Sequence, residues 1–199
     1  RRQRQMCIRD RSSMVSTKIL DENGANLASI LQTILRKKES SKKLTSLLKG
    51  FLPFVDNVSV EHNPDKSVSY KIKECYYNKS FYANFLSDGT VSILALILAL
   101  YFEDHSNIII LEEPERNIHP KLLANLISSA EDVSKEKQVI ITTHNPELLK
   151  YANCDDVRMV TRANCGNTSV TKPSDDLTIK TFLENDLGLE DLFVQGLLE

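Results

Sequence analysis

Residues 108–115 read IIILEEPE, four aliphatic residues followed directly by two carboxylates, a proline and a third carboxylate. An unbroken apolar run rich in β-branched residues predicts a buried strand of a parallel sheet. Pro114 cannot donate to a ladder of backbone hydrogen bonds, so the strand should stop before it. A strand that ends in paired acids can place a metal ion and a base beside a phosphate. It can equally run into a solvated acidic turn, and this stretch alone leaves both interpretations open.

The composition is that of a globular chain large enough to bury a core. The 199 residues are 41% hydrophobic and 26% charged, which is ordinary for this class. The longest apolar run, residues 91–102, is shorter than the ~20 residues that span a bilayer. Cys7, Cys75, Cys154 and Cys165 show no CxxC spacing, which favours reduced thiols over disulfides or zinc. With no signal peptide visible, we expect a cytoplasmic protein without a membrane partner.

The first eleven residues, RRQRQMCIRDR, differ in composition from the rest of the chain. The peptide MCIRD is what a common sequencing-library adapter encodes when it is translated, so we interpret residues 1–11 as an artefact and exclude them from the fold. A natural basic arm is the alternative. Without its five Arg and one Asp, the chain keeps 20 basic and 26 acidic residues, a net charge of −6. This charge gives no electrostatic reason to expect nucleic-acid binding.

Hydrophobic periodicity predicts a mixed α/β chain. A strand, a helix and a strand follow one another across residues 108–143, which implies a βαβ unit with a parallel sheet. The turn at 63–66 predicts a β-hairpin, and Asn26 can cap the first helix. The expected helices span about 26–37, 41–51, 91–102, 121–133, 146–151, 178–184 and 189–193, and the expected strands span about 58–61, 68–73, 108–111, 138–143, 157–161 and 168–171.

An aromatic-rich segment precedes the long apolar helix. We expect its rings to pack in the core or against the sheet rather than to stack on nucleic-acid bases. The residues concerned are Tyr76, Tyr77, Phe81, Tyr82 and Phe85.

The next segment, LSDGT at residues 86–90, opens the apolar helix. Ser87 or Asp88 can cap the helix, and Gly89 lets a phosphate approach the backbone. The free amides and the positive end of the helix dipole attract an anion. A simple helix cap is the alternative explanation for this segment.

Three side chains at the two strand ends can carry chemistry. Successive strand residues point to opposite faces, so Glu112 and Glu113 should have different roles. One can hold Mg²⁺, which prefers oxygen ligands, and the other can polarise an attacking water. His144 follows the second strand and can touch a γ-phosphate and that water. A purely structural histidine is the alternative.

The order of these motifs resembles the C-terminal half of an ABC-type ATPase. LSDGT at 86–90 is similar to the signature loop, ILEEPE at 110–115 to the Walker B strand, residues 116–119 to the D-loop, and ITTHNPELL at 141–149 to the switch-histidine loop. The His-Pro pair at 119–120 resembles the RecF-like and SMC-like branch.

Two flanking segments are similar to a narrower group, the standalone ATPases labelled AAA_21. These segments are DENGANLASIL at 21–31 and LGLEDLFVQGLL at 187–198. The resemblance extends from about Ile19 to the C-terminus. It implies the C-terminal portion of an α/β P-loop NTPase, with a parallel sheet flanked by helices.

The resemblance also implies roles for individual residues. Glu113 matches the catalytic base, His144 the switch histidine, and Glu112 the metal-associated carboxylate. The implied cofactors are ATP and Mg²⁺, and the implied partner is a second copy of the head, since the signature loop acts across a dimer. A DNA partner rests on family analogy alone. The nucleotide-binding residues implied are Ser87, Gly89, Asn117 and His119.

Two departures from the family pattern matter. Glu112 stands where most relatives have Asp, which moves the carboxylate outward by one methylene. No GxxxxGK[ST] phosphate loop occurs anywhere in the sequence. We therefore expect the Walker A lobe to lie upstream of Ser12, and we expect the present chain to be inactive alone.

This interpretation divides the chain into four parts. The expected parts are an artefact at 1–11, a helical and β-hairpin part of the ATPase head at 12–85, a core with signature, Walker B and switch histidine at 86–172, and a C-terminal helical segment at 173–199.

Three other functions compete with an ATPase head that hydrolyses ATP. One is a non-catalytic module that uses nucleotide to control assembly. A second is a transporter ATPase subunit, which the His-Pro pair and the missing LSGGQ loop disfavour. A third is the ATPase part of a larger DNA-repair or phage-defence protein, such as an ATPase fused to a nuclease.

Overall fold

The structure is a computed structural model that describes most of the chain. Residues 1–10, and with them Cys7 and nearly all of the adapter-like segment, lie outside the described residues, as does Cys165. The described residues are 11–13, 19–21, 23–104, 106–163, 166–184 and 187–197.

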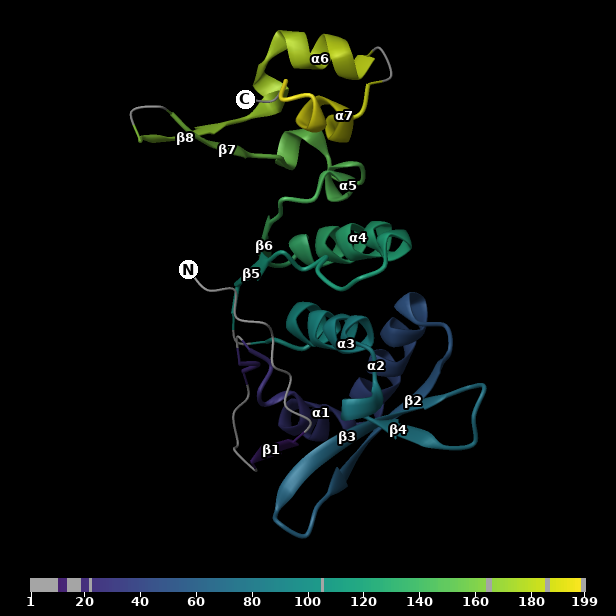
Figure 1. Cartoon of the computed structure of the whole chain (residues 1–199). Helices are drawn as coiled ribbons and strands as arrows, with labels where there is room; N and C mark the ends of the chain where they lie inside the picture. The colour runs from purple at the N-terminus through teal and green to yellow at the C-terminus, as the bar shows by residue number, and fades with distance from the viewer. Residues whose placement is uncertain are drawn as a thin grey trace.

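An antiparallel sheet with two covering helices forms the N-terminal region (Figure 1). Its strand order is β1-β3-β2, and β4 also pairs with β3. The predicted hairpin is confirmed, because β2 and β3 pair on either side of the turn at 63–66. The elements are β1 (Arg11–Ser13), α1 (Leu27–Leu35), α2 (Lys38–Phe51), β2 (Val55–His62), β3 (Ser67–Glu74) and β4 (Ser80–Tyr82).

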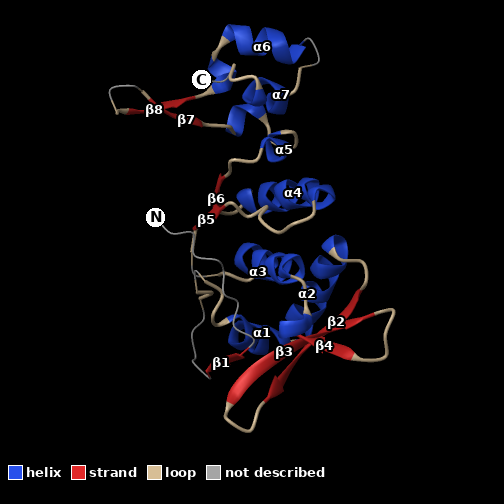
Figure 2. Ribbon diagram, viewed as in Figure 1, coloured by secondary structure: helices blue, strands red, loops and turns tan. Residues whose placement is uncertain are grey.

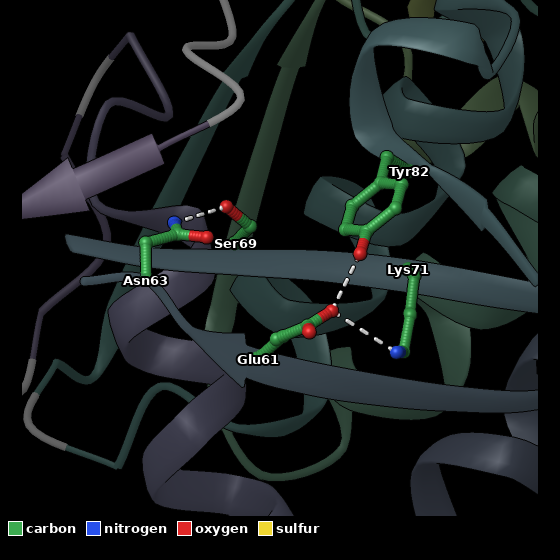
Figure 3. Close-up of polar contacts among 5 residues, drawn as sticks. All are labelled: Glu61, Asn63, Ser69, Lys71 and Tyr82. Atoms are coloured by element: carbon green, nitrogen blue, oxygen red, sulfur yellow. Dashed lines mark hydrogen bonds and ion pairs between the residues drawn. The ribbon is translucent and has the colours of Figure 1, made fainter.

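The two faces of this antiparallel sheet differ in chemistry. Helices α1 and α2 pack on one face, where Val58 and Tyr70 are buried with leucines of both helices. The other face carries polar side chains that satisfy one another (Figure 3). Glu61 Oε2 accepts from the hydroxyl of Tyr82 at 2.6 Å and from Lys71 Nζ at 3.1 Å. One apolar face and one polar face is the usual state of an antiparallel sheet.

The predicted position of Asn26 at the N-cap of the first helix is confirmed, but a side-chain cap is not formed. Asn26 precedes α1, but its side chain makes no capping hydrogen bond. Its Nδ2 instead donates to the carbonyl of Ile19 at 2.7 Å, and its Oδ1 accepts from the amide of Asp21 at 2.9 Å. The buried amide therefore holds the incoming segment against the helix, which a sequence pattern cannot distinguish from a cap.

Helix α3 (Asp88–Tyr101) runs through the middle of the molecule, between α2 and α4 (Figure 1). Nine of its fourteen residues are buried. A helix that is apolar on all sides is expected to be enclosed by other elements. The predicted apolar helix is confirmed, and the 3-10 turn Ala83–Phe85 leads into it.

The predicted βαβ unit is confirmed. Strand β5 (Ile108–Glu112) pairs in parallel with β6 (Gln138–Thr142), and α4 (Leu123–Ser134), entered through the 3-10 turn Pro120–Leu122, connects them. The expectation of a strand buried on both faces is wrong. Ile109 is 6% exposed, whereas its neighbour Ile110 is 68% exposed. Within the described residues, no element covers the face that carries Ile110.

The remaining elements form a smaller C-terminal region (Figure 2). Its own apolar cluster contains Val157, Ile179, Leu189 and Leu192. The elements are α5 (Pro146–Leu149), the 3-10 turns Cys154–Asp156 and Pro173–Asp175, the antiparallel pair β7 (Met159–Arg162) and β8 (Thr168–Thr171), α6 (Leu177–Glu184) and α7 (Leu189–Val194).

Most rings of the aromatic segment before α3 are exposed and none lies in the core, so the core alternative of the prediction is wrong. The sheet alternative holds at Tyr82, which contacts Glu61 and Lys71. Phe81 lies on the short strand β4 and packs edge-to-face on Tyr77, with ring centroids 5.5 Å apart. None of the helices among the described residues combines the length and the apolarity needed to cross a membrane. The exposed rings are Tyr76, Tyr77, Tyr82 and Phe85.

Candidate active site

The two adjacent glutamates at the end of β5 lie in different surroundings. Glu112 pairs in register with Thr142 and is exposed on the uncovered face of the sheet. Glu113 still donates its amide to the carbonyl of Thr142 at 2.8 Å, but its φ of +46° turns the chain out of the strand. A positive φ is costly for a residue with a side chain, so the surrounding contacts must hold it.

Residues 113–118 form a tight turn, which we call the acidic turn. The amide of Arg116 donates to the carbonyl of Glu113 at 3.1 Å, and the amide of Ile118 donates to that of Glu115 at 3.0 Å. Asn117 has a φ of +64°. Arg116 Nη1 lies 3.9 Å from Glu113 Oε2, and both side chains are partly exposed, so this ion pair contributes little stability.

An open hollow of about 430 Å³ lies at the carboxyl ends of β5 and β6. It brings Glu113 together with His144, which belongs to residues 143–145 after β6, here called the histidine turn. Ligands of α/β sheets bind at the carboxyl ends of the strands. The lining residues are Glu113, Glu115, Arg116, His144, Asn145 and Pro146.

Glu115 also lines the hollow, although the sequence motifs predict no role for it. Its side chain is 8% exposed, and its Oε1 accepts a hydrogen bond from the hydroxyl of Thr143. The same hydroxyl accepts from the amide of Asn145 at 2.9 Å. The only sequence signal was a third acid directly after Pro114.

The signature-like loop at the start of α3 lies outside this hollow. The Ser87 hydroxyl accepts from the amide of Thr90 at 3.1 Å, so the predicted cap at Ser87 is confirmed. Gly89 has a second structural reason to be glycine. A Cβ at this position would lie 2.5 Å from the carbonyl oxygen of Asn117, so only glycine permits this approach to the acidic turn.

The D-loop-like residues Asn117 and His119 are exposed. The Asn117 carbonyl faces Gly89, as described above, and His119 Nδ1 accepts from the amide of Lys121 at 3.2 Å. Neither residue lines the hollow. Their nucleotide-binding roles, like those of Ser87 and Gly89, stay predictions.

The donor set at the strand end is compatible with Mg²⁺. Within the described residues, no group of three or more His, Cys, Asp or Glu side chains is placed to hold a metal ion. Mg²⁺ beside phosphates needs only one or two protein carboxylates, because waters and phosphate oxygens complete its shell. The exposed carboxylate of Glu112 fits that requirement.

Comparison with protein families places most of the chain in one group. A family model described as "AAA domain, putative AbiEii toxin, Type IV TA system" matches residues 20–150. A search of curated proteins found no match.

Solved structures of SMC ATPase heads share the fold. A chain from a study of ATP-driven dimerization and DNA-stimulated activation of SMC ATPases has a TM-score of 0.58 and 16% identity, covering 78% of this chain and 97% of that chain. An Smc head bound to the C-winged helix domain of ScpA has a TM-score of 0.56 and 14% identity over 76% of this chain.

The Smc head domain with a coiled coil and joint from Pyrococcus yayanosii has a TM-score of 0.54 and 16% identity over 83% of this chain. The matches cover 46% of the ScpA-bound Smc head and 34% of the Pyrococcus chain, less than half of each. At these identities the likeness establishes the fold alone, which is that of a P-loop, ABC-type ATPase head.

Proposed function

We propose a function from this premise: the chain belongs to the AAA_21 family of AAA domains and has the fold of an SMC-type ATPase head. Family and fold together support an ATPase-type function. The finer proposal is that this chain is the half of an ATP-hydrolysing head that carries the signature loop, the acidic turn and the histidine turn.

The observation that carries the proposal is the shared hollow at the strand ends. Glu113 and His144, which are 31 positions apart in sequence, both line it. Glu113 would accept the proton of the attacking water, since a carboxylate within hydrogen-bond reach can act as a general base. His144 would orient the γ-phosphate and that water. Glu112 would hold Mg²⁺, which neutralises phosphate charge when bound.

The phosphate loop would come from a lobe outside these 199 residues. No GxxxxGK[ST] occurs in the chain, and the uncovered face of the β5–β6 sheet exposes Ile108, Ile110 and Ile140 beside Glu112. Parallel sheets are normally covered on both faces. A lobe packed on this face would bury the isoleucines and bring its phosphate loop to the carboxylate.

A second copy of the head would complete the site. Ser87 and Gly89 lie outside the hollow that contains Glu113, which is consistent with a signature loop that serves a nucleotide held by a partner copy. The helix amides at this loop suit a phosphate anion.

The 199-residue chain allows a direct first test. Titration with ATP and Mg²⁺ by calorimetry should show no saturation in the micromolar range, because the loop that makes most phosphate contacts is absent. Micromolar affinity would refute the proposed division of labour between two lobes.

The second test needs the same chain joined to a lobe that carries the phosphate loop. Glu113→Gln should lower kcat by about 10²-fold or more, as expected for loss of a general base, and should accumulate an ATP-bound dimer on size-exclusion chromatography. Glu136→Gln, at an exposed residue after α4, is the matched control and should hydrolyse normally. Unchanged turnover in Glu113→Gln would remove Glu113 from the role of base.

A further inference from the structure

We propose that Glu115 is a positioning residue that ties the histidine turn to the acidic turn, so that His144 and Glu113 face one hollow. The proposal deepens the ATPase function above and rests on it for its catalytic consequence. Its structural part concerns the contact between Glu115 and Thr143, both residues of this chain.

A relay of two hydrogen bonds carries this proposal. The amide of Asn145 donates to Thr143 Oγ1 at 2.9 Å, and the Thr143 hydroxyl donates to Glu115 Oε1. His144 lies between the two residues whose groups are held. The relay therefore restrains the backbone on both sides of the histidine.

The backbone ladder does not provide this restraint. Strand β6 ends at Thr142, whose carbonyl accepts the amide of Glu113 at 2.8 Å. Helix α5 begins at Pro146, and the amide of Leu148 donates to the carbonyl of the N-cap residue Asn145 at 3.1 Å. Between these two elements, the Thr143–Glu115 bond is a side-chain link from the histidine turn to the acidic turn.

The burial of Glu115 indicates that the link is maintained at a cost. A buried carboxylate loses its hydration and needs hydrogen bonds in return. Glu115 Oε2 has no hydrogen-bond partner among the described residues, so only part of that loss is recovered. Replacing both partners of such a hydrogen bond by apolar groups of the same shape can be neutral or even stabilising. The acid is therefore explained better by the geometry it imposes than by stability.

The acidic turn is in turn anchored to α3. The carbonyl of Asn117 packs against Gly89 with no room for a Cβ, and the carbonyl of Glu115 accepts the amide of Ile118 at 3.0 Å. Glu115 thus joins the histidine turn to a segment that is already fixed against the signature-like loop.

The first test is amide hydrogen exchange of the 199-residue chain, read at Asn145 by NMR. Glu115→Ala removes only the bond from Thr143 to Glu115 and leaves the Asn145 amide its acceptor, so this variant tests the link, and it should accelerate exchange by about tenfold. Thr143→Val removes both bonds of the relay and should accelerate exchange at least as much. Thr143→Ser and Glu115→Gln keep the donor and the acceptor and should stay within about twofold of wild type. The double variant Thr143→Val with Glu115→Ala should exchange no faster than Thr143→Val alone, because Thr143→Val already removes the bond to Glu115.

Thr45→Val is the matched control. It removes a hydroxyl that donates to the carbonyl of Ser41 at 3.0 Å inside α2, far from the hollow in sequence, and Asn145 exchange should not change. Unchanged exchange in Glu115→Ala would overturn the proposal, and so would an equal acceleration in Thr45→Val. If Glu115→Ala does not fold, Glu115→Leu, which fills the buried site but offers no acceptor to Thr143, decides the outcome in its place.

The second test uses the 199-residue chain joined to a lobe that carries the phosphate loop. Thr143→Val should lower kcat by about tenfold with the KM for ATP within about twofold, and Thr143→Ser should restore kcat. A change in KM alone would refute positioning of the catalytic groups. If the wild type hydrolyses no ATP, the proposed function fails, whereas the exchange result still decides whether Glu115 holds the histidine turn.

Discussion

The two sheets of the head differ on the face turned away from the helices. On this face of the antiparallel β2–β3–β4 sheet, polar side chains form hydrogen bonds with one another. Glu61 accepts from Tyr82 and Lys71, and Asn63 donates to Ser69 at 2.6 Å (Figure 3). The parallel β5–β6 sheet instead exposes isoleucines on its outer face.

The difference shows which surface is complete within this chain. Strands of the antiparallel sheet alternate apolar and polar residues, as suits a sheet with one wet face. The IIIL run of β5 and the VII run of β6 are apolar at consecutive positions, a composition that suits burial on both faces. The parallel sheet thus carries the composition of a central sheet while the described residues cover only one of its faces, which supports a lobe that packs against it.

The largest expected effect is the difference in lost stability between substitutions on the two faces of β5. Ile109→Ala should lower the free energy of unfolding by about 2–5 kcal/mol, because it leaves a cavity in the main core. Ile110→Ala, one residue along, should change it by no more than about 0.5 kcal/mol in this chain. Urea denaturation followed by circular dichroism measures both. Equal losses would mean that the outer face is already covered.

The next prediction compares the change in stability when a glycine is replaced at two places. Gly89 contacts the acidic turn that follows β5, and Gly50 lies in α2, which covers the antiparallel sheet. Gly89→Ala should destabilise by about 1–3 kcal/mol, since its Cβ would meet the Asn117 carbonyl at 2.5 Å. Gly50→Ala in α2 has no atom within 4 Å of the added Cβ and should stabilise by about 0.5–1 kcal/mol. Thermal unfolding of both variants measures whether the two changes in stability have opposite signs. An unchanged stability in Gly89→Ala would contradict the close contact between Gly89 and Asn117.

The smallest effect concerns the polar face of the antiparallel sheet. The hydrogen bond from Tyr82, followed by that from Lys71, lowers the pKa of Glu61 from its ordinary value. Tyr82→Phe should therefore raise this pKa, as carboxyl NMR titration would show. A lowered pKa stabilises the fold above the pKa of the unfolded chain, and this contribution is lost as pH falls through the folded pKa. The variant should lose part of that pH dependence, and an unchanged Glu61 titration would contradict the assignment.

Much of the fold was predictable because its signals are local. The hairpin around residues 63–66, the apolar helix α3 and the β5–α4–β6 unit all follow from periodicity within one window of sequence. The errors concern surroundings. The aromatic rings at 76–85 and Ile110 have strand or core composition, but their exposure depends on which elements pack over them.

The candidate site likewise contains residues that local sequence motifs predict and residues that they do not. Glu113 and His144 were recognisable from motif order, because each ends a predicted strand and the carboxyl ends of parallel strands meet at one edge. Glu115 was not recognisable, because its burial and its bond to Thr143 join residues 28 positions apart. The requirement for Gly89 likewise depends on Asn117, which lies on another loop.

The sequence by itself determined the order of elements, the family resemblance and the residue types at the two strand ends, since these are properties of short segments. The packing in three dimensions places the two turns at one hollow, joins them through the bond from Thr143 to Glu115, and leaves one face of the parallel sheet uncovered by the described residues. Those features depend on the packing of distant segments, and burial and hydrogen bonding are decided by that packing.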